Sequence, residues 1–144
     1  MLMLIVATII NSLLLTLAVL THYEALRMLS MVIPKESNKR YLHILLVFFV
    51  IIIAHIIEIW LFALGYYFMN NTGMGSLEGN FYGTLLDCGY FSFTSYTSLG
   101  YGDVYPLGYL RYLSGLEALT GLLMIAWTAS FMFIEMQKFW HIKK

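Results

Sequence analysis

The chain has 144 residues, of which 60% are hydrophobic and 11% are charged, and its eight Lys and Arg residues balance its eight Asp and Glu residues. A soluble domain carries about 25% charged residues, so this composition excludes an ordinary soluble protein and indicates a membrane protein. Its apolar runs are interpreted as spanning helices, so we expect an all-α fold. Zero net charge gives no indication of a nucleic-acid partner. The single cysteine, Cys88, can form no disulfide within the chain and fits no metal-ligand spacing.

The first apolar run, residues 2–21, is uncharged and long enough to cross a ~30 Å hydrocarbon core as a helix. A cleaved signal peptide is the alternative, but no basic residue precedes the run and no small-x-small cleavage site follows it. The polar stretch up to residue 40 contains four basic residues: Arg27, Lys35, Lys39 and Arg40. Basic loops stay in the cytoplasm, so we expect residues 1–40 to form a spanning helix and a cytoplasmic linker, with the amino terminus outside.

Within this linker, residues 24–33 have apolar side chains at helical spacing. Such a segment lies along the membrane surface as an amphipathic helix or forms a solvated loop, and the sequence leaves both open.

Two further apolar runs follow, and both are longer than the bilayer requires. Residues 41–69 are expected to form an outer helix, which carries His55 and Glu58 among its apolar residues. Residues 109–138 are expected to form an inner helix that contains Glu117. The chain then ends with further basic residues, so the positive-inside rule places the carboxyl terminus in the cytoplasm.

Residues 82–96 are too short and too polar to cross the membrane. They are followed by residues 97–103, which read Thr-Ser-Leu-Gly-Tyr-Gly-Asp. A dehydrated cation needs oxygen ligands, and a ring of backbone carbonyls provides them without a fixed charge. Aiming successive carbonyls at one axis requires dihedrals that glycine adopts at little cost, and Gly100 and Gly102 occupy alternate positions.

This heptapeptide resembles the selectivity filter of potassium channels, Thr-Thr-Val-Gly-Tyr-Gly-Asp, and the resemblance extends from Tyr90 to Arg111. It implies that residues 41–144 form a pore module with a re-entrant pore helix over 82–96 and a filter loop over 97–103. Because one chain supplies one loop, it also implies a homotetramer in the lipid bilayer. We therefore expect a passive potassium channel of the plasma membrane, not an enzyme, with no cofactor besides K⁺.

The resemblance also implies roles for individual residues. Bound K⁺ would lie between backbone carbonyls along the filter, contributed by Ser98, Leu99, Gly100 and Tyr101, and the Ser98 hydroxyl would complete the innermost site. Gly102 would close the filter. Thr97 would cap the pore helix.

Support of the outer mouth departs from the family pattern. Asp103 would face the mouth, and Arg111 would lie at the top of the inner helix. The tryptophan and glutamate that restrain this aspartate in many family members are replaced by Tyr90 and Thr94. We expect the Tyr90 hydroxyl to reach Asp103.

Gly121 lies near the position where the family keeps a hinge in its inner helix. It is interpreted either as a gating hinge or as a site of close helix packing.

His55, Glu58 and Glu117 are costly inside a membrane unless they are paired. Their depths allow a shared cluster behind the filter, while the alternative is that each glutamate is satisfied separately by a hydroxyl such as that of Thr94 or Tyr96. We expect Glu58 or Glu117 to accept hydrogen bonds from the pore helix, in place of Thr94, and His55 to tune its charge.

Other functions stay open. Ser98, Leu99 and Thr94 depart from the usual filter, which suggests a cation channel of relaxed selectivity. A membrane enzyme or metal-binding protein using His55 and Glu58 with Glu117 is a weaker hypothesis, because no ligand spacing such as His-Glu-x-x-His is present. Two further hypotheses stay open from the sequence: the chain is itself a non-conducting regulatory subunit, or it is a channel that associates with such a subunit.

Overall fold

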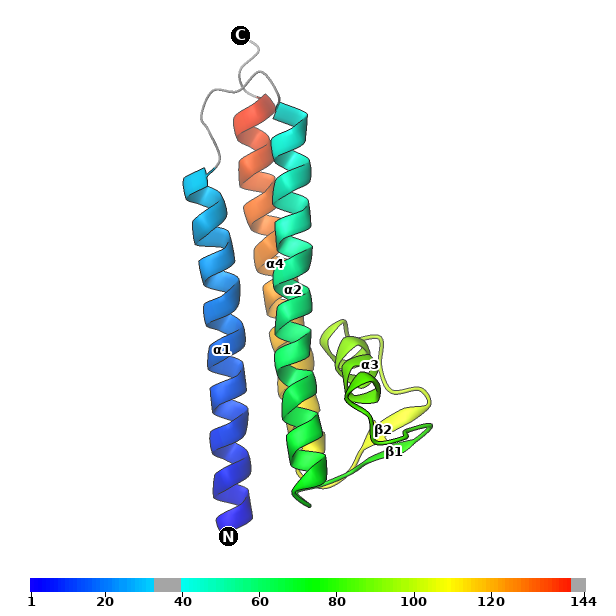
Figure 1. Ribbon diagram of the computed structural model, residues 1–144. Coiled ribbons are helices and arrows are strands. Elements are labelled where there is room, and N and C mark those ends of the chain that lie inside the picture. Colours follow the sequence, from blue (N-terminus) through cyan, green and yellow to red (C-terminus); the bar gives the residue numbers. More distant parts are fainter. Residues whose placement is uncertain (33–39, 141–144) are drawn as a thin grey trace.

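The computed structural model describes residues 1–32 and 40–140, and its architecture is helical (Figure 1). The elements in chain order are α1 (Leu2–Val32), α2 (Arg40–Asn71), β1 (Leu77–Gly79), α3 (Leu85–Tyr96), β2 (Val104–Pro106) and α4 (Leu110–Trp140). Three of these helices, α1, α2 and α4, are long and apolar enough to cross a membrane. The chain is therefore a membrane protein with three candidate spans.

The three long helices lie side by side, with α2 antiparallel to α1 and α4 (Figure 1). The short helix α3 packs on α2 and α4, close to the amino-terminal end of α4. Both strands lie at that same end of the bundle, and the last turns of α1 and α4 lie at the opposite end. This topology gathers all residues between α2 and α4 at one end of the molecule.

The core is built from aromatic and small side chains where α3 meets the long helices. Phe62 and Tyr66 of α2 and Phe91 of α3 are fully buried. On α1, Ala18 is fully buried as well. Lipid competes for apolar contacts inside a bilayer, so close packing of such small residues and polar bonds between helices decide which helices associate.

Helix α1 continues to Val32 instead of ending at residue 21. Leu26 and Leu29 explain the extension, because they pack in a second core cluster with Val47 and Ile51 of α2. The prediction of a surface helix or a solvated loop over residues 24–33 is therefore wrong for residues 24–32, which continue the long helix α1. Residues 33–39, with two of the basic residues of the linker, lie outside the described part.

Helix α3 begins at Leu85, three residues later than expected from the 82–96 segment, because Thr84 caps it. Thr84 Oγ1 accepts a hydrogen bond from the Asp87 amide at 3.1 Å, and the Asp87 carboxylate accepts one from the Thr84 amide at 3.0 Å. This reciprocal pair is a capping box. The Thr84 amide is also the main reason why the pKa of Asp87 is lowered.

The two strands, each of three residues, were not predicted. They pair antiparallel with Gly79 opposite Val104, and so they join the two segments that flank α3 and its following loop. Three residues are too few to show the alternation by which a strand is predicted.

Candidate functional site

The loop over residues 97–103 directly follows the carboxyl end of α3. Thr97 is the C-cap of this helix, and its hydroxyl donates to the Phe93 carbonyl at 2.7 Å. Beyond it, the Ser98 amide donates to Ser95 O and the Leu99 amide to Thr94 O, both at 3.0 Å. This pair of bonds is a Schellman motif, in which the residue after the C-cap adopts a left-handed conformation.

Ser98 fills that left-handed position with a φ of +57°, and Gly100 follows with +92°. Gly102 lies outside the left-handed region. Left-handed residues therefore alternate along the loop as expected, but the pair is Ser98 and Gly100 rather than Gly100 and Gly102. The difference arises because the end of α3 imposes its own geometry on Ser98.

Ser98, Leu99, Gly100 and Tyr101 are all exposed in the single chain, but the Tyr101 side chain is anchored to two helices. The Tyr101 ring stacks on Phe91 of α3, with ring centroids 5.6 Å apart. Its hydroxyl donates to Ser114 Oγ of α4, since Ser114 directs its own proton to the Arg111 carbonyl at 2.9 Å. The tyrosine thus braces the loop against two helices.

Asp103 is held from both sides. The Tyr90 hydroxyl donates to Asp103 Oδ1 at 2.9 Å, so the bond expected from the sequence is present. Asn80 donates its side-chain amide to Oδ2 at 3.4 Å and its backbone amide to Asp103 O at 2.8 Å. The Tyr90 bond is the main reason why the pKa of the Asp103 carboxyl lies below its usual range. Thr94 donates instead to the Phe91 carbonyl of its own helix, at 2.8 Å.

Gly79 fits tightly beside this aspartate. A Cβ at Gly79 would lie 1.9 Å from Asp103 O, and its φ of +102° also requires glycine. Sequence reasoning missed Gly79 and Asn80, because their only signal was a Gly-Asn pair in a polar loop.

Arg111 lies in the first turn of α4 and is exposed. Together with Tyr101, Tyr105 and Leu107, it lines a hollow of ≈ 500 Å³. The hollow places a cationic side chain on the same end of the molecule as Asp103.

Glu117 of α4 is fully buried and binds hydroxyls from two other helices. Tyr66 of α2 donates to Oε2 at 2.5 Å, and Ser92 of α3 lies 2.5 Å from Oε1. Each carboxylate oxygen therefore has a partner, and the side chain ties α2, α3 and α4 together.

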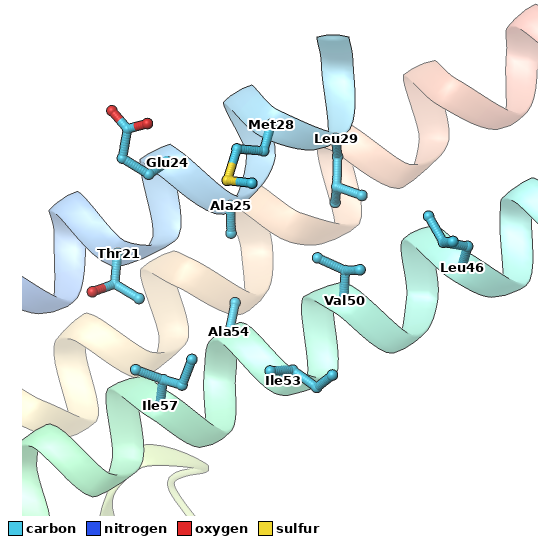
Figure 2. A pocket seen from close by; sticks show the side chains of 10 residues that line it. All are labelled: Thr21, Glu24, Ala25, Met28, Leu29, Leu46, Val50, Ile53, Ala54 and Ile57. Atoms are coloured by element: carbon cyan, nitrogen blue, oxygen red, sulfur yellow. The ribbon is translucent and has the colours of Figure 1, made fainter. Parts of the chain in front are cut away.

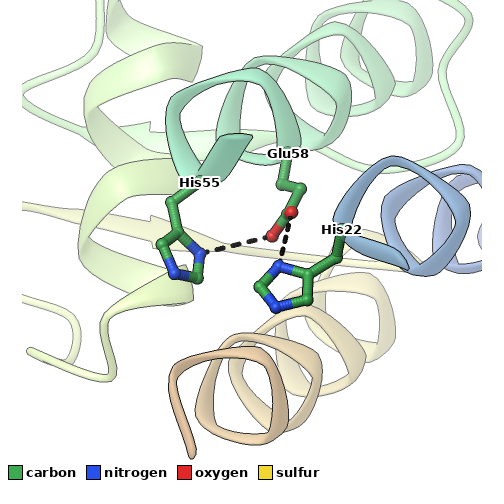
Figure 3. Close-up of side chains that lie close together, drawn as sticks. All are labelled: His22, His55 and Glu58. Carbon is green, nitrogen blue, oxygen red and sulfur yellow. Dashed lines mark hydrogen bonds and ion pairs between the residues drawn. The ribbon is translucent and has the colours of Figure 1, made fainter. Parts of the chain in front are cut away.

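Glu58 of α2 is also fully buried, and it is the centre of a second group (Figure 3). His22 Nδ1 of α1 lies 3.0 Å from Glu58 Oε1, and His55 Nδ1 lies 3.4 Å from Oε2. The Tyr96 hydroxyl of α3 donates to Oε2. Thr128 Oγ1 of α4 lies 3.1 Å from His55 Nε2 and 3.2 Å from His22 Nε2. This group joins all four helices.

The two glutamates are thus satisfied in two separate groups and not in a shared cluster behind the filter. Both accept a hydrogen bond from α3, as expected, and His55 lies beside Glu58 rather than Glu117. Sequence reasoning missed four partners: His22, Tyr66, Ser92 and Thr128. His22 escaped notice because it was assigned to the linker, whereas it is buried in α1 with 1% of its surface exposed.

Gly121 lies in the middle of α4, which continues as a helix on both sides of it. A Cβ at this position would lie 2.0 Å from the Tyr96 carbonyl oxygen. The observed role of Gly121 is therefore close packing against the end of α3, and the hinge stays a prediction.

A groove of ≈ 370 Å³ lies between α1 and α2 (Figure 2). Its lining is almost entirely apolar and includes Met28, Leu29, Val50 and Ile53. The Glu24 carboxylate points away from it. The groove therefore offers a hydrocarbon surface rather than a site for an ion.

A family model described as "Ion channel" matches residues 41–138, which include α3, the 97–103 loop and nearly all of α2 and α4. No curated protein and no solved structure matched the chain.

Proposed function

We propose that this chain, which belongs to the ion channel family, conducts potassium passively and selectively through residues 97–103. The observation that carries the proposal is the construction of this loop. Ser98 to Gly100 are exposed on the single chain, while the side chains of Tyr101 and Asp103 are held by hydrogen bonds to α4 and α3. A loop that is exposed but fixed from behind is suited to present backbone carbonyls to an ion.

A single loop forms only one wall of a pore. Replacing the hydration shell of K⁺ requires carbonyls from all sides, so we propose that four copies close into a ring. K⁺ would then bind between the carbonyls of Ser98, Leu99, Gly100 and Tyr101. The exposed side of the loop is the side that the neighbouring copies would contact.

We further propose that α3 is a re-entrant pore helix. With 12 residues it is too short to span the bilayer, and it ends directly at the loop. The negative end of its dipole would favour a cation at that point.

The loop end of the bundle is proposed to face outward, with the amino terminus outside and the carboxyl terminus in the cytoplasm. The last turns of α1 and α4 lie at the other end, and the sequence attaches its basic clusters there (Figure 1). Basic segments are retained in the cytoplasm, which supports this orientation.

A flux assay with the purified chain in liposomes tests the proposal. Liposomes loaded with potassium should release it when a proton ionophore compensates the charge, and protein-free liposomes should not. Sub-millimolar Ba²⁺, a divalent ion of similar radius, should block the release. Absence of release from liposomes that contain folded protein would contradict the proposal.

A further inference from the structure

We propose that His22, His55 and Glu58 form a binding site for a divalent transition metal, with Zn²⁺ as the ion that suits the ligands. The site lies between α1 and α2, next to the end of α3 (Figure 3). It does not depend on the proposed function, because metal binding is measured without ion conduction.

The ligand atoms already converge. The two histidine Nδ1 atoms point at the Glu58 carboxylate, at 3.0 Å for His22 and 3.4 Å for His55. In a tetrahedral zinc site with bonds of about 2.0–2.1 Å, neighbouring ligand atoms lie roughly 3.3 Å apart. The ligand atoms of the three residues lie within 4.8 Å of one another, so small side-chain rotations would bring an ion into contact with all three.

The Nε2 atoms of His22 and His55, which face away from Glu58, are positioned as in histidines that bind a metal. A histidine that binds a metal usually donates its other ring N–H to a fixed acceptor. Here both Nε2 atoms lie within 3.1–3.2 Å of one hydroxyl oxygen, Thr128 Oγ1. That oxygen has two lone pairs, so it can accept from both rings when their Nδ1 atoms bind a metal.

The hydroxyl of Tyr96 completes the surroundings. It donates to Glu58 Oε2, which leaves Oε1 for the ion, and it lies 2.9 Å from His55 Nδ1. Tyr96 is therefore the nearest candidate for a fourth ligand. Because it directly precedes Thr97, a bound metal would fix the end of α3 where the 97–103 loop begins.

The donor set also determines the class of metal. Two imidazoles and one carboxylate suit Zn²⁺ and its transition-metal neighbours, while Ca²⁺ and Mg²⁺ require a shell of oxygens. The single negative charge of Glu58 offsets part of the charge of the ion inside a buried site.

Calorimetric titration of Zn²⁺ into the full chain, purified without a polyhistidine tag and placed in lipid nanodiscs, tests the site. Wild type should bind one Zn²⁺ per chain, and Ca²⁺ should give no binding heat. His22→Gln, His55→Gln and Glu58→Gln should each lose the site. Thr128→Val should weaken it by about 10–100-fold, because only the outer support is removed.

Two matched variants serve as controls. Glu117→Gln changes a buried carboxylate outside the site, and His43→Gln changes a histidine near the start of α2, so both should retain Zn²⁺ binding. The Zn X-ray absorption spectrum of wild type gives an answer even if a ligand variant fails to fold, and it should show scattering from two imidazoles. Lack of Zn²⁺ binding by wild type, retention of the site in His22→Gln or His55→Gln, or a spectrum without imidazole scattering would overturn the proposal.

Discussion

Ser98 and Gly100 give the 97–103 loop its shape. A left-handed conformation costs a residue with a Cβ about 1–2 kcal/mol, and Ser98 adopts it because the Schellman bonds at the end of α3 require it. Gly100 bears no such cost. The curvature of the loop therefore depends on one strained residue and one glycine.

Replacing Gly100 by alanine is expected to abolish potassium flux, while the protein still inserts and folds. The added Cβ would meet no neighbouring atom, so the effect arises from the φ of +92° and not from a clash. Flux into liposomes measures it, with Gly73→Ala as control. Gly73 has a similar φ of +73° and equally open surroundings, but it lies in the turn after α2. Undiminished flux through Gly100→Ala would contradict the assignment of the loop.

Tyr90→Phe is expected to speed inactivation or reduce selectivity, because Asp103 loses the hydroxyl that holds it. The bond also predicts a pH dependence. It lowers the pKa of Asp103 below the usual value of about 3.9. The carboxylate therefore stays charged even at an external pH somewhat below that value. The charge is lost only when the external pH falls through the lowered pKa.

In Tyr90→Phe this pKa should rise, and current should decline at a less acidic external pH than in wild type. Recordings during external acidification measure the shift. Tyr82→Phe, which changes an exposed tyrosine, is the matched control and should behave as wild type. Identical kinetics and acid response in Tyr90→Phe and wild type would show that the bond has no role in conduction.

Single residues of the site could be predicted where a local motif specified them. The bond from Tyr90 to Asp103 followed from the positions of the two residues in the motif. The roles of Gly79 and His22 could not be predicted, since they arise from contacts with residues far along the chain. A buried histidine in an apolar helix looks like the start of a linker until its partner is known.

At the scale of the elements, α3 is held at three levels, by two polar bonds and one aromatic stack. Ser92 binds Glu117 of α4, Tyr96 binds Glu58 of α2, and Phe91 stacks on Tyr101 of the loop that follows. These contacts position α3 against α2, α4 and the loop that follows.

Tyr66→Phe is expected to lower the free energy of unfolding by about 1–3 kcal/mol, because a buried side-chain oxygen of Glu117 loses its donor. Denaturant titration of the purified protein measures the change. Tyr67→Phe alters the neighbouring residue, which is 40% exposed, and should change stability little. Equal stability of the two variants would mean that Glu117 does not depend on Tyr66.

Gly121→Ala is expected to destabilise the protein by about 1–3 kcal/mol, because the new Cβ would overlap the Tyr96 carbonyl. Gly115→Ala in the same helix meets no neighbour within 4 Å and should be neutral or slightly stabilising. Thermal unfolding distinguishes the two. If Gly121→Ala is as stable as Gly115→Ala but changes gating, the hinge interpretation is favoured over packing.

The helices were predicted more completely than the contacts between them. Apolar runs of sufficient length specify α2 and α4 within two residues at each end. The length of α1 could not be predicted, because Leu26 and Leu29 keep it helical through contacts with α2 rather than through a local signal.

For the whole molecule, three long helices form a scaffold that holds the 97–103 loop at one end. The loop is exposed on the single chain, so the proposed channel exists only when several copies assemble. The stability of the single chain and the selectivity of the assembled channel are separate properties. Tyr66→Phe and Gly121→Ala test the first, and Gly100→Ala and Tyr90→Phe test the second.

Selectivity for potassium distinguishes the proposed channel from a general cation channel, and the reversal potential measures it. The purified chain is placed in a planar bilayer with potassium on one side and sodium on the other. A potassium-selective channel should give a reversal potential close to that of a membrane permeable to potassium alone. A reversal potential near zero would contradict this selectivity, and would show a cation channel of relaxed selectivity.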